Sequence, residues 1–80
     1  MLIHSVLRVF GKEYFRFLTS EEDDLYLVGR IDALRDMIDT IGFEDEASNI
    51  ITKISLVVKH EGSFEAKKIE VDSWLNETYY

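Results

Sequence analysis

Apolar residues in the segment 20–41 recur at the spacing of an amphipathic helix. Five of them lie three or four positions apart and share one helix face: Leu27, Ile31, Leu34, Ile38 and Ile41. Thr19 and Glu22 have the Thr-x-x-Glu spacing of a capping box, which satisfies free backbone N–H groups at a helix start. Gly42 stands where a left-handed glycine commonly ends a helix. We therefore predict a helix over 20–41.

Residues 2–18 show the same period, although they also fit a strand. One helical face holds seven apolar residues: Ile3, Val6, Leu7, Phe10, Tyr14, Phe17 and Leu18. A competing alternation places five at odd positions: Ile3, Leu7, Val9, Phe15 and Phe17. Gly11-Lys12 would then open a hairpin turn. The helical period accounts for more of the polar positions, so we predict a helix over 2–18. The first two helices should form an antiparallel hairpin joined at Leu18–Ser20.

The second half of the chain leaves helix and strand both open. Residues 44–61 fit a helical face, but the stretch is rich in β-branched residues and alternates from Ile50 to Val58. Ser63 could cap a last helix after Gly62, or residues 64–71 could return as a strand. The predicted fold is mainly α, a small bundle of amphipathic helices. The alternative is an α+β fold with a β-hairpin at about 50–71.

Composition narrows the class of protein. Eighty residues, of which 46% are hydrophobic, predict one small domain over 1–80 and argue against disorder. The absence of cysteine excludes disulfides and thiolate chemistry. No apolar run approaches the roughly 20 residues of a membrane span, and the first residues are too polar for a signal peptide. We expect no membrane association and a cytoplasmic location, or the virion or host cytoplasm if the protein is viral.

The net charge of −7 is distributed unevenly along the chain. Residues 1–18 hold three basic residues against one acid, whereas residues 19–49 hold two basic residues against ten acids. The last segment, 50–80, is nearly balanced, with four lysines against five acids. A protein that binds nucleic acid through its phosphates would show the opposite bias. We therefore expect no direct contact with nucleic acid.

Two charged stripes of opposite sign are candidate contact surfaces. The basic stripe has one residue per helical turn and consists of Arg8, Lys12 and Arg16, preceded by His4. The acidic stripe on the outward face of the second helix consists of Asp32, Asp36 and Asp39. Complementary stripes suit a protein that docks on a copy of itself or on a protein partner. The simpler interpretation is that both stripes are the solvated backs of amphipathic helices.

Aromatic residues are the second set of candidate contacts. One Trp, four Tyr and five Phe exceed what the core of so short a chain comfortably holds. Phe15 lies off the apolar face of its helix, Tyr26 lies at the edge of its own, and Tyr79-Tyr80 ends the chain. Because aromatic residues are enriched among interface anchors, we expect these to touch a partner. Trp74 is expected to lie in the core.

Catalytic and metal-binding patterns are missing from the sequence. His4 and His60 have unrelated contexts, the serines lack a nucleophile elbow, and the glycines form no phosphate loop. The acidic runs 21–24 and 44–46 lack the spacing of a calcium loop and suit helix first turns. We expect neither an enzyme nor a metal, cofactor or small-molecule substrate.

Two functions fit these features. The first is a non-catalytic protein–protein interaction protein, a small adaptor or structural subunit that forms oligomers. The alternative is an acidic inhibitor of the kind that phages encode. Such a protein presents carboxylates at intervals like those of phosphates and blocks a nucleic-acid-binding enzyme.

Overall fold

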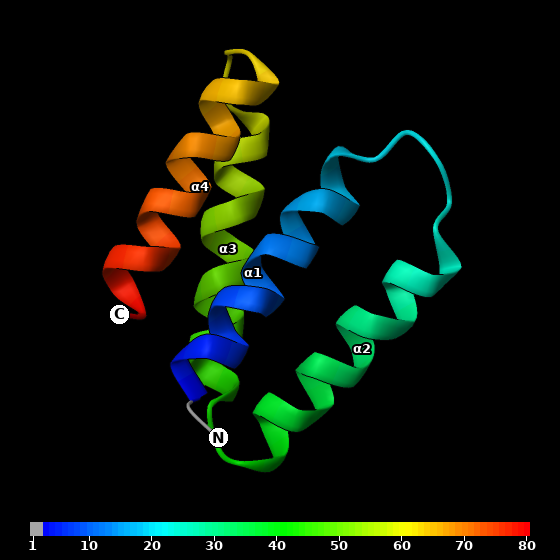
Figure 1. Ribbon diagram of the computed structural model, residues 1–80, viewed down its shortest axis with the longest axis vertical. Coiled ribbons are helices and arrows are strands. Elements are labelled where there is room, and N and C mark those ends of the chain that lie inside the picture. Colours follow the sequence, from blue (N-terminus) through cyan, green and yellow to red (C-terminus); the bar gives the residue numbers. More distant parts are fainter. Residues whose placement is uncertain (1–2) are drawn as a thin grey trace.

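The computed structural model describes residues 3–80 and folds them into four α-helices (Figure 1). Their bounds are Ile3–Thr19 (α1), Leu25–Thr40 (α2), Glu44–Lys59 (α3) and Phe64–Thr78 (α4). The predicted mainly helical bundle is confirmed. The β-hairpin at 50–71 is wrong, as is the strand in the first segment, since residues 3–80 form no strand. Position 2 of the first predicted helix lies outside the described residues.

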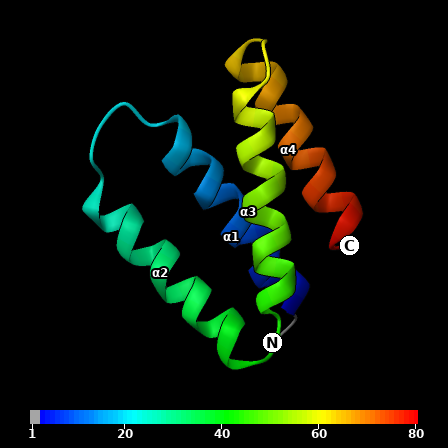
Figure 2. The same ribbon diagram turned by 180° about the vertical axis from the view of Figure 1, so that it is seen from behind.

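Helices α1 and α3 form the centre of the bundle, because each of them packs against the three other helices. Helices α2 and α4 lie on opposite flanks and do not touch each other (Figures 1 and 2). Helices α1 and α2 run in opposite directions, so the predicted antiparallel hairpin is confirmed (Figure 1).

The core lies between α1 and α3, and α2 and α4 contribute side chains to it from either flank. Its wholly buried large side chains are Leu7, Phe10, Ile38, Ile50, Ile54, Val57, Val71 and Leu75. Helix α3 buries four residues at helical spacing, whereas α2 buries only Leu27 and Ile38. Helix α4 likewise buries only Val71 and Leu75. Since full burial of such a side chain is worth about 1.5–3 kcal/mol, α2 and α4 are both attached more weakly than α3.

Tertiary packing explains why α3 is a helix, although its sequence also fits a strand. Its buried residues Ala47, Ile50, Ile54 and Val57 follow the helical period, while Leu56, which the strand pattern would bury with Ile54, is exposed. Three acids in the first turn of α3 and Lys59 in its last turn also match the helix dipole. These preferences outweigh the β-branched composition, because strand and helix propensities are weak against burial.

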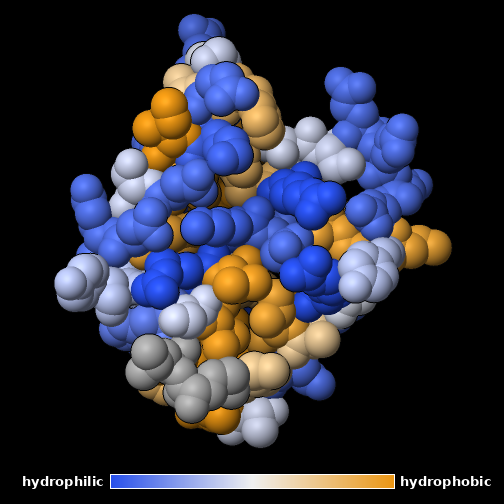
Figure 3. Space-filling model, in the orientation of Figure 1, coloured by the Kyte–Doolittle hydropathy of each residue, from blue (hydrophilic) through white to orange (hydrophobic). Residues whose placement is uncertain are grey.

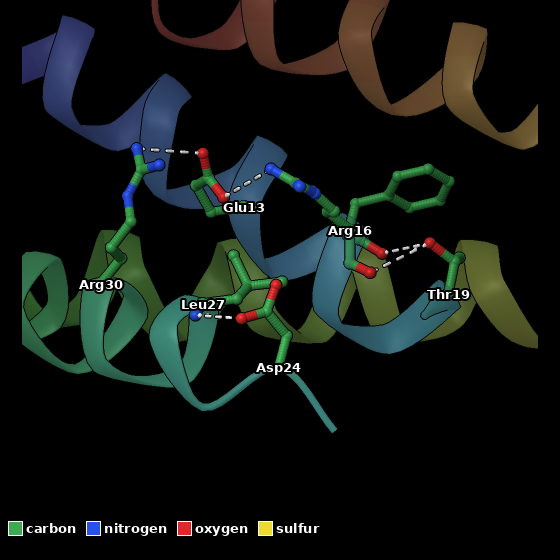
Figure 4. Close-up of polar contacts among 7 residues, drawn as sticks. Glu13, Arg16, Thr19, Asp24, Leu27 and Arg30 are labelled. Carbon is green, nitrogen blue, oxygen red and sulfur yellow. Dashed lines mark hydrogen bonds and ion pairs between the residues drawn. The ribbon is translucent and has the colours of Figure 1, made fainter. Parts of the chain in front are cut away.

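The start of α2 differs from the prediction. Thr19 is the last residue of α1, where its hydroxyl donates a hydrogen bond to the Phe15 carbonyl at 2.8 Å. Asp24 caps α2 instead, and its Oδ1 accepts a bond from the Leu27 N–H at 3.0 Å (Figure 4). Aspartate is a slightly better cap than threonine. The capping box is therefore wrong, and residues 20–24, rather than Leu18–Ser20, join the hairpin.

The other predicted helix ends are confirmed. Gly42 has a φ of +89°, and the N–H groups of Gly42 and Phe43 bond to the carbonyls of Asp39 and Ile38 at 3.1 and 3.0 Å. This pair of bonds is a Schellman motif, which requires the left-handed conformation that glycine adopts most easily. Ser63 caps α4 by accepting a bond from the Ala66 N–H at 3.1 Å.

Gly11 allows α1 to approach α4 closely. A Cβ added to Gly11 would lie 2.6 and 2.8 Å from the two Cδ atoms of Leu75, which is wholly buried. The hairpin turn considered at Gly11-Lys12 is therefore wrong, because this glycine lies inside a helix. Gly29 is different, since a Cβ there would meet nothing within 4 Å.

The two helical glycines should respond oppositely to alanine. Gly29→Ala should raise the free energy of unfolding by about 1 kcal/mol through helix propensity alone. Gly11→Ala has the same gain, but displacing Leu75 in a full core costs about 1–3 kcal/mol, so stability should fall. Urea unfolding of both variants checks this, and a stabilised Gly11→Ala protein would contradict the close crossing.

The corrected cap can be tested with a matched pair. Asp24→Ala should lower the free energy of unfolding by about 1 kcal/mol, because it leaves an N–H of the first turn of α2 without its acceptor. Glu22→Ala should change stability little, since Glu22 precedes the helix. Thermal unfolding followed by circular dichroism measures both. A loss of stability in Glu22→Ala without one in Asp24→Ala would favour the capping box instead.

Candidate protein-docking surface

A groove of about 450 Å³ runs between the end of α1 and the start of α4. Its lining combines basic, acidic and aromatic side chains: Lys12, Glu13, Phe15, Arg16, Thr19, Phe64, Lys68 and Asp72. Lys12 and Arg16 belong to the basic stripe predicted from the sequence. The structure thus places two of the three residues of that stripe beside α4, which contributes a further cation, Lys68, to the same groove.

Two stacked phenyl rings form the apolar part of this groove. The rings of Phe15 and Phe64 have centroids 5.6 Å apart and planes inclined by 26°. Phe15 is only 5% exposed, so its predicted position off the apolar face is wrong. The reason is that α4 covers the side of α1 that holds Gly11 and Phe15, one turn apart. Phe64 remains 51% exposed and offers an apolar contact.

The charged groups of the groove are loosely paired. Lys68 lies 3.3 Å from a carboxylate oxygen of Asp72, and Arg16 lies 3.9 Å from one of Glu13. Exposed pairs of this kind contribute only about 0–1 kcal/mol each, so their cations can form new contacts at little cost. Lys12 makes no ion pair or hydrogen bond with the described residues.

Glu13 connects α1 to α2 rather than serving the groove alone. Its side chain is 14% exposed, and its Oε1 lies 3.2 Å from a guanidinium nitrogen of Arg30 (Figure 4). Its other oxygen, Oε2, accepts no hydrogen bond within the part of the chain described and faces Arg16 (Figure 4). One signal for this role was present in the sequence, since Glu13 is the only acid among residues 1–18.

Arg8 of the basic stripe, and His4 before it, contact the last residues of the chain. Arg8 donates hydrogen bonds to the Tyr79 carbonyl and, at 3.1 Å, to the Ser5 hydroxyl. His4 Nδ1 lies 3.0 Å from the Tyr80 carbonyl. A cation near the carbonyl end of α4 also complements the helix dipole. Arg8, predicted as a partner contact, is therefore engaged within its own chain.

The terminal tyrosines have opposite environments. Tyr79 is buried, with its ring edge-on to Trp74 at 5.8 Å and to His4 at 5.9 Å. Trp74 is half-buried against the core, as expected. Tyr80 is 98% exposed. Of the two terminal tyrosines predicted as contacts, only Tyr80 is free to meet a partner without a rearrangement.

The acidic stripe forms an exposed surface on the outer side of α2. Asp32, Asp36 and Asp39 are all exposed, and only Asp39 forms an ion pair with a described residue, Arg35 at 3.0 Å. We call this surface, together with the exposed acids of the 20–24 connection and of the first turn of α3, the acidic flank. Its members are Glu21, Glu22, Asp23, Asp32, Asp36, Asp39, Glu44 and Asp45.

Apolar side chains are exposed beside these charges. Leu25 and Tyr26, at the start of α2, are 82% and 76% exposed, and the Arg30 guanidinium lies 6.0 Å from the Tyr26 ring centre. A second, smaller groove of about 180 Å³ separates α1 from α2 and is lined largely by apolar residues, Phe17 and Val28 among them. One face of the molecule shows hydrophilic residues interrupted by separate apolar patches (Figure 3).

Within residues 3–80, no three His, Asp or Glu side chains come close enough together to hold a metal ion. No helix in this range is long and apolar enough to cross a membrane. Comparison with protein-family models, with curated proteins and with solved structures finds no match, so the function is argued from the surfaces themselves.

The burial of Tyr79 predicts how the stability of the protein changes at high pH. Burial raises the pKa of its phenol above the ordinary 10.0, and the Glu46 carboxylate raises this pKa further. As the pH rises above 10, the unfolded chain loses this proton before the folded chain does. The contribution of the neutral phenol to the free energy of unfolding is therefore fully present below pH 10. It is lost as the pH rises through the raised pKa of Tyr79 in the folded protein. Tyr79→Phe should show a smaller loss of stability between pH 9 and 11, measured by urea unfolding.

Proposed function

We propose that this protein acts by non-catalytic protein–protein contact, as a small adaptor or structural subunit that assembles with copies of itself or with a protein partner. The observation that carries the proposal is the exposure of large apolar side chains beside charged surfaces of opposite sign. Leu25 and Tyr26 are more than three-quarters exposed, next to the acidic flank. Phe64 is half exposed within the basic groove.

A specific contact needs both charged groups and exposed apolar groups. Exposed ion pairs steer association and set its orientation, but each contributes little affinity. Apolar and aromatic anchors supply most of the binding energy when they become fully desolvated. In this protein the two kinds of group lie together on α2 and again in the groove between α1 and α4.

The acidic flank favours a second function, inhibition of a nucleic-acid-binding enzyme by charge mimicry. Helix capping would explain the acids at 21–24 in a simpler way, but only Asp24 caps α2. Glu21, Glu22 and Asp23 are exposed in the loop and extend the charge of the helix face. A set of exposed carboxylates of this kind suits a cationic groove that normally holds phosphates.

Solution mass at two salt concentrations separates the two functions. An assembling subunit should exceed the 9.4 kDa of one chain, and its mass should rise with protein concentration. We expect light scattering to show this at low salt, with a modest change at high salt because apolar contacts persist when charges are screened.

The inhibitor gives a different result in the same experiment. It should remain at the mass of one chain, and it should bind an immobilised basic enzyme with an affinity that falls steeply as salt increases. A protein that stays monomeric at every concentration and ignores salt would contradict assembly as its function.

A further inference from the structure

We infer that the groove between α1 and α4 binds the acidic flank of a second copy of this chain, so that copies join head to tail. The inference rests on the proposed function and names the surfaces through which self-assembly would occur. The receptor is the cationic and aromatic lining contributed by Lys12, Arg16, Lys68 and Phe64. The ligand is the outward face of α2, with Leu25, Asp32 and Asp36.

The groove offers the charge and the apolar contact that this ligand requires. Three cations line it against two carboxylates, Glu13 and Asp72. Glu13 already interacts with Arg30, and Asp72 with Lys68. Lys12, which has no partner among residues 3–80, and Arg16, whose only pair is long, are the cations most able to accept a new carboxylate.

The outward face of α2 has matching chemistry at matching intervals. Asp32 and Asp36 are exposed and one helical turn apart, about 6 Å along the axis, which is also the rise between Lys12 and Arg16 on α1. Leu25 lies two turns before Asp32 on the same side of the helix and is almost fully exposed. An apolar residue at the end of an acidic stripe can therefore meet Phe64 while the carboxylates meet the basic residues.

Charge complementarity favours a second copy over a nucleic acid as occupant. The chain carries −7 overall, so its far field repels any strongly anionic partner, a second copy included, and attraction is confined to the groove. Glu13 and Asp72 would oppose a continuous row of phosphates there. The acidic flank has spaced carboxylates and an apolar anchor, which a phosphate backbone lacks.

The fold also determines the kind of assembly. Helix α2 carries the ligand surface, α4 forms one wall of the receptor, and these two helices do not touch (Figures 1 and 2). One copy therefore cannot fill its own groove. Because ligand and receptor are different surfaces, the contact is heterologous, and repetition gives a ring or an open chain rather than a two-fold dimer.

Charge reversal on either surface tests the inference. Lys12→Glu in the groove and Asp36→Lys on the flank should each weaken self-association about fivefold or more, measured by light scattering across a dilution series. Matched controls reverse the same charges elsewhere: Lys59→Glu at the end of α3 and Glu70→Lys on the outer side of α4. They should associate like the unaltered protein, and circular dichroism should show equal helicity for all four variants.

Mixing the two variants gives the decisive result. The Lys12→Glu protein keeps an intact flank, and the Asp36→Lys protein keeps an intact groove, so the mixture should associate with about the affinity of the original contact although each variant alone associates weakly. If the unaltered protein assembles but the groove and flank variants match their controls, the inferred interface is wrong while assembly itself stands. If the unaltered protein remains monomeric at every concentration, both fail.

Discussion

The fold depends on the burial of two sides of α1. One side carries Leu7 and Phe10 into the core, and the adjoining side carries Gly11 and Phe15 against α4. Because α1 is the helix around which the others are arranged, its remaining exposed strip is narrow. The groove follows from this arrangement. Helix α4 crosses α1 closely at Gly11, so the charged and aromatic side chains in the last turns of α1 lie beside those in the first turns of α4.

Much of the fold could be predicted because periodicity, caps and burial agree along most of the chain. The helix ends at Gly42 and Ser63 have local causes. Gly42 adopts the left-handed conformation and Ser63 supplies a side-chain acceptor, so both ends could be predicted from the sequence. The start of α2 was mispredicted because four successive acids follow Thr19, and local spacing does not say which residue becomes the cap. The third helix was ambiguous because its β-branched residues satisfy both periods until a neighbouring helix selects one face.

The candidate surfaces were predicted less completely, because they depend on which helices become neighbours. Phe15 was assigned to the surface from the pattern of α1 alone, and only the approach of α4 makes it part of the core. Arg8 and Arg16 belong to one stripe in sequence, yet Arg8 meets the Tyr79 carbonyl and Arg16 faces the groove. Asp32 and Asp36 were placed correctly because an outward face requires no neighbour.

The weak attachment of α2 has a consequence for conformational exchange. This helix buries two side chains, contacts nothing on α4, and is joined to α1 by a five-residue connection, 20–24, that contains no proline. Its Glu13–Arg30 pair is partly open to water. Detachment of α2 therefore requires less free energy than detachment of α3, and the backbone amides of α2 should exchange with deuterium before those of α3. A detached α2 could dock on the α1–α3 surface of another molecule, so domain swapping is a route by which this fold could exchange its acidic helix.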